Sequence, residues 1–174
     1  MKIKKVLNNS GVSILEVIVA ILIITVGMVG VLSLVIQNIR VQYIDKNILI
    51  ASSLAQEGVE LIRNIRDLNW LTPGNLWNQG VVGSGADYTY AIDYGGRGSI
   101  NLAVDAIGDA GAKLYTNSDG FYTHTSTGNT ATAFSRLITV VDNINYLDVK
   151  CTIRWSEGTQ NHDYTAETYL YDWK

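Results

Sequence analysis

The hydrophobic pattern of the chain begins with one uninterrupted apolar run near the N-terminus. Residues 17–36 contain no charged side chain, and Glu16 is the single ionisable residue between Ser10 and Ile36. As a helix, such a run rises about 30 Å, the thickness of a bilayer's hydrocarbon core. It is longer than the apolar part of a removable secretory signal, and no A-x-A-like cleavage site follows it. The pattern therefore predicts a transmembrane helix over 12–36 that remains as an anchor.

After this run charged residues return, and the pattern becomes that of an amphipathic helix over 37–70. Apolar or small residues recur at alternating intervals of four and three positions. They are Ile44, Ile48, Ala51, Ala55, Gly58, Ile62 and Ile65. The stripe predicts a face that packs on the rest of the protein, with a coiled-coil dimer as the alternative. Gly58 allows a close approach, whereas Arg66 lies within the apolar arc and needs a partner. Pro73 marks the end of the pattern.

Short strands and turns are predicted for the β-rich globular region 75–174. Strands are expected at 87–94, 112–115, 121–125, 136–141, 147–155 and 164–173, with loops at 80–85 and 95–98 and a hairpin turn at 117–120. The clearest strand is 147–155, where apolar and polar residues alternate and Cys151 falls on the apolar side. A long helix followed by such strands predicts an α+β fold, with an antiparallel sheet covering the helix's apolar face.

Charge and cysteine content limit the classes of partner. The chain has 174 residues and a formal net charge of −3. Lys2, Lys4 and Lys5 precede the apolar run, and the positive-inside rule keeps them in the cytoplasm. The remainder is acidic, which argues against general nucleic-acid binding. With Cys151 as its single cysteine, the chain forms no intrachain disulfide.

Residues that could carry chemistry are sparse. His124 and His162 are isolated, and both are expected at the surface or in turns. No nucleophile-elbow motif is present, so an enzyme is not expected. Asp105, Asp109 and Asp119 do not have the spacing of an EF-hand loop. The sequence therefore predicts no cofactor.

Glu16 is the one unusual polar residue, because it lies at the start of an apolar helix. Ser13 and Glu16 have the spacing of a capping box, in which the serine side chain bonds the glutamate N–H and the carboxylate bonds back. A carboxylate also suits the positive end of the helix dipole. Helix capping accounts for Ser13 and Glu16, but not for Gly11 or the basic leader.

All of these features together resemble the cleavage and methylation signature of type IV prepilins and pseudopilins. The resemblance rests on the basic leader, on Gly11-Val12-Ser13-Ile14-Leu15-Glu16 and on the apolar helix that follows. It implies that a prepilin peptidase cuts after Gly11, removes the leader 1–11 and methylates the new amine of Val12. It also implies that Glu16 pairs with that amine of a neighbouring subunit. The stretch 55–70 is similar to minor-pilin-like sequences.

The resemblance implies a minor pilin or pseudopilin that enters the bacterial inner membrane and is built into an extracellular or periplasmic filament. The expected partners are the prepilin peptidase, other pilins or pseudopilins and the inner-membrane assembly platform. Some pseudopilins bind calcium in C-terminal loops, so calcium is a further option. Two features depart from the family: Val12 stands where phenylalanine or methionine is usual, and the apolar helix lacks a proline. A filament-tip binding module and a membrane-tethered domain that never polymerises are the alternatives.

Overall fold

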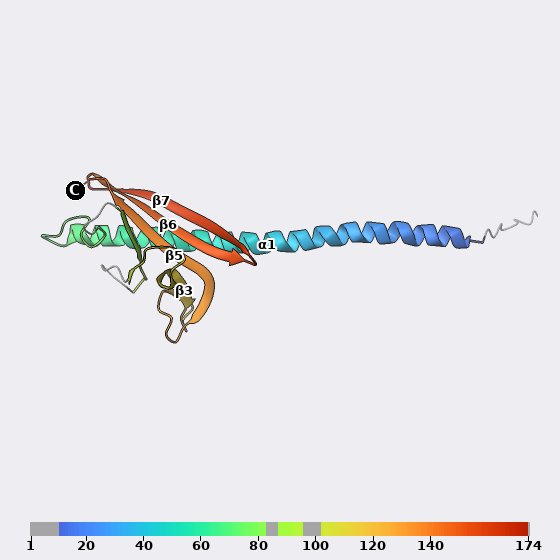
Figure 1. The fold of residues 1–174 in the computed structure, drawn as a ribbon. Coiled ribbons are helices and arrows are strands. Elements are labelled where there is room, and N and C mark those ends of the chain that lie inside the picture. The colour runs from blue at the N-terminus through green and yellow to red at the C-terminus, as the bar shows by residue number, and fades with distance from the viewer. Residues whose placement is uncertain (1–10, 83–86, 96–101, 174) are drawn as a thin grey trace, which may run out of the picture. The chain divides into compact units, whose positions relative to one another are not determined.

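The structure, a computed structural model, describes residues 11–82, 87–95 and 102–173. The chain divides into two compact units, residues 1–45 and 46–174. One helix, α1 (Ile14–Leu71), begins in the first unit and ends in the second (Figure 1). Residues 46–71 of this helix therefore form one unit with the C-terminal sheet.

The end of α1 follows from its sequence. Leu71 is the last helical residue, and Thr72 closes the final turn by donating its hydroxyl to the Leu68 carbonyl at 2.9 Å. Pro73 cannot continue the hydrogen-bond ladder of the helix. Gly74 then adopts a positive φ of 89°, a conformation that side chains with a Cβ disfavour. The predicted break at Pro73 is confirmed.

The second unit contains a seven-stranded antiparallel sheet. Its strands are β1 (Asp87–Ala91), β2 (Leu102–Ala103), β3 (Lys113–Thr116), β4 (Tyr122–Thr123), β5 (Thr130–Asp142), β6 (Tyr146–Glu157) and β7 (Gln160–Tyr171). The three long strands run β5-β6-β7, as Figure 1 shows. The other edge of β5 is shared, because β3 pairs with its first half and β1 with its second half. One edge of β5 is therefore divided between two short strands, and the sheet branches there.

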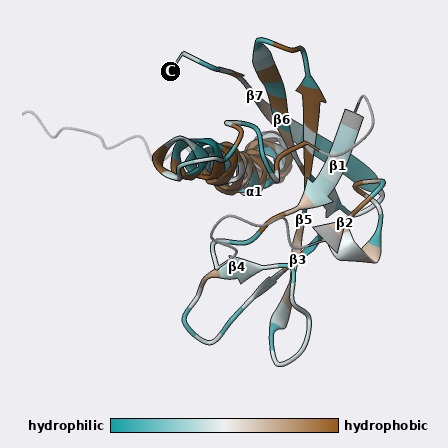
Figure 2. Ribbon diagram, turned by 90° about the vertical axis from the view of Figure 1, so that its left-hand side faces the viewer, coloured by the Kyte–Doolittle hydropathy of each residue, from teal (hydrophilic) through white to brown (hydrophobic). Residues whose placement is uncertain are grey.

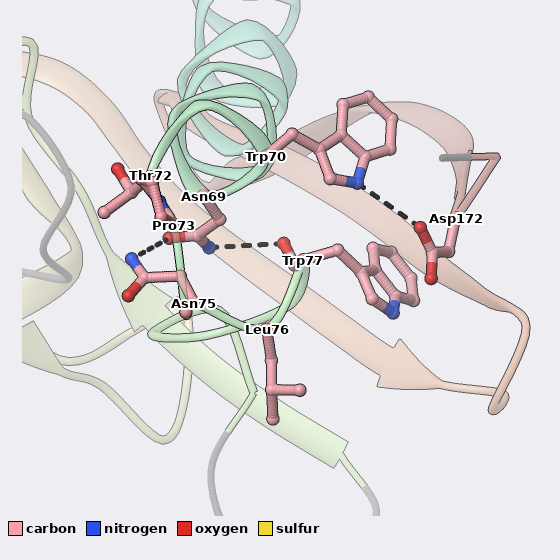
Figure 3. A pocket seen from close by; sticks show the side chains of 9 residues that line it. Asn69, Trp70, Thr72, Pro73, Asn75, Leu76, Trp77 and Asp172 are labelled. Carbon is pink, nitrogen blue, oxygen red and sulfur yellow. Dashed lines mark hydrogen bonds between the residues drawn. The ribbon is translucent and has the colours of Figure 1, made fainter.

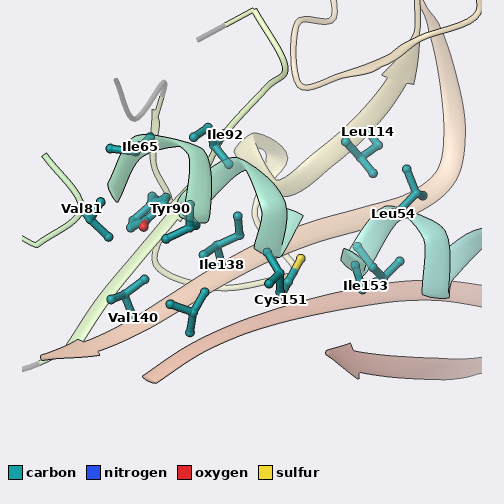
Figure 4. Packing of buried hydrophobic residues seen from close by; sticks show 14 of the residues in the cluster. Leu54, Ile65, Val81, Tyr90, Ile92, Leu114, Ile138, Val140, Cys151 and Ile153 are labelled. Carbon is teal, nitrogen blue, oxygen red and sulfur yellow. The ribbon is translucent and has the colours of Figure 1, made fainter. Parts of the chain in front are cut away.

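The core lies between residues 51–65 of α1 and one face of the sheet. The buried helix residues are Ala51, Leu54, Ala55, Gly58, Val59, Ile62 and Ile65. Every second residue is buried against them from Phe134 onward in β5 and from Leu147 onward in β6. Figure 2 shows hydrophobic stretches in brown on the long strands, and Figure 4 shows the side chains of Ile138, Val140, Cys151 and Ile153 in this packing. Both the α+β fold and the alternation over 147–155 are confirmed. Near the N-terminal end of the stripe, Ile44 is half-buried and Ile48 is exposed.

Several predicted boundaries need correction. The strand expected over 87–94 ends at Ala91, and the strand expected over 121–125 is only Tyr122–Thr123. Ala112 closes a short 3₁₀ helix, η1 (Ala110–Ala112), instead of opening a strand. β5 begins at Thr130, six positions before the prediction, and β2 was not predicted. Most of the loops expected at 80–85 and 95–98 lies outside the described residues.

Candidate functional site

The residues expected at the processing site lie directly before α1. Gly11, Val12 and Ser13 are outside the helix, and the Ser13 carbonyl accepts the first helical hydrogen bond, from the Val17 N–H at 3.2 Å. Val12 is 69% exposed, and, apart from Gly11 itself and its chain neighbours, no atom of the described residues lies within 4 Å of a Cβ placed on Gly11. The bond between Gly11 and Val12 is therefore sterically accessible. Lys2, Lys4 and Lys5 lie outside the described residues.

Glu16 lies in the first turn of α1, where the aligned peptide dipoles favour a negative charge. Ser13 has the position of a helix cap, but neither side-chain hydrogen bond of a capping box forms. Within the described part of the chain, the Glu16 carboxylate has no hydrogen bond and no ion pair. The capping interpretation thus accounts for the position of Glu16 but gives its carboxylate no partner.

The apolar run forms a helical surface that is hydrophobic on all sides. Every large apolar side chain between Val17 and Ile36 is 46–68% exposed. Thr25 and Ser33 donate their hydroxyls to the carbonyls of Leu22 and Val29, at 2.9 and 3.0 Å. Their polar groups are thereby satisfied within the helix, as an apolar environment requires. This part of α1 is long and apolar enough to cross a membrane.

A buried polar cluster in the second unit was missed by the sequence reasoning. Arg136 of β5 has a fully buried side chain and donates from Nη2 to the Ile92 carbonyl at 2.6 Å. Its Nη1 lies 3.3 Å from a Glu57 carboxylate oxygen on α1, and its Nη2 lies 3.7 Å from Asp93. Arg136 occupies an inward position of β5, so the strand's alternation was the signal that could have identified it.

Asp93 connects this arginine to the short strand β4. Its carboxylate accepts hydrogen bonds from the Thr123 hydroxyl at 2.8 Å and from the backbone N–H of His124 at 3.0 Å. The Nδ1 atom of His124 lies 2.6 Å from the same carboxylate. Burial by itself raises the pKa of Asp93, but the bonds from His124 and Thr123 outweigh it, and the net pKa is lowered. The cluster therefore holds the carboxylate charged.

Two histidine predictions are settled by these contacts. His124 was expected to be a surface or turn residue: its backbone lies in a bend directly after β4, but its side chain is not at the surface, because it is 5% exposed and bound to Asp93. His162 lies in β7 and stacks on Trp155, with ring centroids 5.3 Å apart. The prediction that Cys151 is a core residue is confirmed. Burial raises the pKa of its thiol to about 12, so the thiol stays protonated.

The aspartates considered for calcium do not converge. Asp109 accepts a hydrogen bond from the Ala106 N–H at 2.9 Å, whereas Asp119 lies in the turn after β3. Among residues 11–82, 87–95 and 102–173, no group of three or more His, Cys, Asp or Glu side chains could hold a metal ion. Calcium binding therefore gains no support from the described residues.

No protein-family model, curated protein or solved structure matches this chain.

Proposed function

We propose that this chain is a minor pilin or pseudopilin. A prepilin peptidase cleaves it after Gly11 and methylates Val12, and the mature subunit joins a type IV pilus or a type II secretion pseudopilus. The observation that carries the proposal is the order of features at the start of α1. An exposed Gly11–Val12 bond is followed by Glu16, which has no partner among the described residues, and then by a helix that is apolar on all sides.

The subunit leaves the apolar surface over 17–36 uncovered, and cleavage adds a charged group beside it. The apolar surface over 17–36 needs lipid before assembly, and it can pack against equivalent helices afterwards. Cleavage creates an α-amino group with an ordinary pKa near 7.7–8.0. In an apolar filament core this cation requires an anionic partner, and the Glu16 of a neighbouring subunit supplies one. Before cleavage the amine does not exist, so cleavage would switch assembly on.

The proposed partners follow from this role. They are the prepilin peptidase, other pilins or pseudopilins and an inner-membrane assembly platform. The precursor would lie in the bacterial inner membrane with its second unit outside the cytoplasm. In this role the chain is a substrate of the peptidase and has a structural function in a filament.

The test is N-terminal sequencing and intact-mass measurement of the full chain after co-expression with a prepilin peptidase. We expect a mature chain that begins at Val12 and is heavier by one methyl group. Gly11→Val should abolish processing, whereas the matched change Gly27→Val, in the apolar helix, should not, because beyond the helix's own nearby backbone no described residue lies within 4 Å of a Cβ at Gly27. A chain that still begins at Met1 would contradict the proposal and favour a membrane-tethered domain.

A further inference from the structure

A cleft of about 340 Å³ lies at the C-terminal end of α1, entirely within the second unit (Figure 3). Its walls include two indole rings, Trp70 and Trp77, and three polar side chains, Asn69, Asn75 and Asp172. This volume is at the lower end of the range for small-molecule sites, about 300–1,000 Å³. None of these residues takes part in the proposed processing or in the pairing of Glu16.

Hydrogen bonds fix the loop side of the cleft against the helix. The Asn69 amide donates to the carbonyls of Trp77 at 3.2 Å and of Gln79 at 2.7 Å. The Asn75 amide donates in turn to the Asn69 side-chain oxygen at 3.3 Å, and Figure 3 shows this chain of bonds. The loop that carries Trp77 is therefore tied to the last turn of α1. Such preorganisation lowers the entropic cost of binding a ligand.

The opposite wall is held by contacts of Trp70. Its indole N–H donates to Asp172 at 3.3 Å. The Arg66 guanidinium lies 4.4 Å from the Trp70 ring centroid and 4.9 Å from that of Trp173, and it also bonds the Asp67 carboxylate at 2.8 Å. Arg66, which the sequence placed in an apolar arc, thus finds its partners here. These contacts fix the orientation of the Trp70 ring at the cleft.

Three polar atoms of the lining are left for a ligand. Within the described residues, no hydrogen bond is made by the Trp77 indole N–H, the Asn75 side-chain oxygen or the Asp172 Oδ2 atom. The cleft therefore offers one donor and two acceptors beside aromatic surface. A ligand that matches it must have apolar faces and also both hydroxyl donors and acceptors around its edge.

We propose that this cleft binds a neutral saccharide. The C–H groups on one face of a pyranose ring carry small positive partial charges, and an indole ring presents a negative face to them. The sugar hydroxyls can donate to Asn75 and Asp172 and accept from the Trp77 N–H. This inference does not rest on processing or filament assembly, because every residue involved belongs to the second unit.

Other ligand classes fit the cleft less well. Among the described residues, no lysine or arginine lines the cleft, and Asp172 repels anions, so a phosphate or nucleotide finds no cationic partner there. An apolar ligand would give no hydrogen bond to the Asn75 side-chain oxygen or to the Asp172 Oδ2 atom. A cation would find two indoles and one carboxylate, but the Arg66 guanidinium next to Trp70 opposes it. The cation class is therefore included in the test as a competing outcome.

The test is saturation-transfer NMR and tryptophan-fluorescence titration of the full, unprocessed chain with cellobiose, chitobiose and choline chloride. Because the chain has an apolar helix, it is kept in solution in detergent micelles. The detergent is of the polyoxyethylene type, because detergents with sugar headgroups would compete for the cleft. We expect saturation transfer to the ring protons of at least one disaccharide and none to choline. Trp77→Ala should weaken binding by about tenfold or more, since it removes both ring face and N–H donor.

Three further variants separate the ligand classes and guard against unfolding. Trp77→Phe keeps an aromatic ring, so this variant should still bind the saccharide, but more weakly. Asp172→Asn keeps an acceptor for the Trp70 N–H or for a sugar hydroxyl, so it should weaken saccharide binding only modestly. Phe121→Ala, an exposed aromatic residue outside the cleft, should leave binding unchanged. Lack of binding by both disaccharides to folded protein would overturn the proposal. So would choline binding that Asp172→Asn abolishes, or saccharide binding that the folded Trp77 variants retain in full.

Discussion

Gly58 of α1 lies directly against Cys151 of β6. A Cβ atom added to Gly58 would be 2.5 Å from the Cys151 Sγ atom and 3.5 Å from the Arg136 Cδ atom. The absence of a side chain at Gly58 thus allows helix and sheet to approach closely in the core. The small residue that weakens the helix locally is therefore required by the packing.

The first prediction is that Gly58→Ala destabilises the second unit, although alanine favours a helix by about 1 kcal/mol. The added methyl group must displace the sulfur within a packed core, which typically costs about 1–3 kcal/mol. Urea unfolding followed by tryptophan fluorescence measures the effect, because all four tryptophans lie in the second unit. Combining Gly58→Ala with Cys151→Ala removes the clash and should restore part of the loss. A more stable Gly58→Ala variant would contradict the packing argument.

The second prediction concerns the buried charge of Arg136. Arg136→Met removes the cation that faces Asp93 and Glu57, and we expect a loss of about 3–5 kcal/mol in the free energy of unfolding. Arg154→Met is the matched control, because Arg154 also pairs with an aspartate, Asp163, but on the outer face of the sheet. Such exposed pairs contribute about 0–1 kcal/mol. Equal losses in the two variants would show that the pairing of Arg136 with Asp93 and Glu57 adds no more stability than an exposed ion pair.

The third prediction is a loss of stability in acid that depends on Asp93. Its pKa is lowered in the folded state relative to the ordinary value of 3.8, so the folded protein binds this proton less readily than the unfolded chain does. The stabilisation is complete above pH 3.8 and disappears as the pH falls toward the lowered folded pKa. Urea unfolding at a series of acid pH values should show this decline.

Asp93→Asn should reduce the steepness of that decline while lowering stability at neutral pH. Asp163 is the control, because the Arg154 bond also lowers its pKa, but at an exposed position. Asp163→Asn should change the acid profile less. If both variants keep the full slope of the original protein, Asp93 is not the group responsible.

The fourth prediction concerns strain in the turn between β5 and β6. Ile144 has a φ of 67°, and it is the only non-glycine residue with positive φ among residues 11–82, 87–95 and 102–173. A β-branched side chain disfavours this region, and Ile144 is also 88% exposed, so it gains nothing from burial. Ile144→Gly should raise the free energy of unfolding by about 1 kcal/mol. Asn145→Gly, at a position without positive φ, should lower it instead.

The sequence predicted the structure correctly where that structure depends on residues close together in the sequence. The alternation over 147–155 identified the buried face of β6, and the stripe through Gly58 identified the buried face of α1. β2 has only two residues and no alternation of its own, and it exists because β1 lies beside it. Short strands of this kind are set by tertiary pairing, not by local pattern.

The candidate sites also differ in whether the sequence could identify them. Every residue of the processing site lies within a few positions of Gly11, so a motif could identify it. The saccharide cleft and the Arg136 cluster bring together residues far apart in sequence, such as Trp77 with Asp172 and Arg136 with Asp93. No local spacing encodes those pairs, and only the fold reveals them.

The last prediction tests the proposed pairing of Glu16 with the Val12 amine. Glu16→Gln keeps the size of the side chain but removes its charge, and Gly11 and Val12 are unchanged, so peptidase processing should continue. In the filament core the amine would lose its anionic partner, and an unpaired buried charge costs about 3–5 kcal/mol. We therefore expect incorporation into filaments to fall by at least about a hundredfold. Immunoblots of sheared filaments, compared with the membrane fraction, measure this. Co-expression with the original subunit should partly rescue the variant, because its own amine can still pair with a neighbour's intact Glu16. A processed Glu16→Gln subunit that enters filaments as efficiently as the original would exclude the pairing while leaving the processing proposal intact.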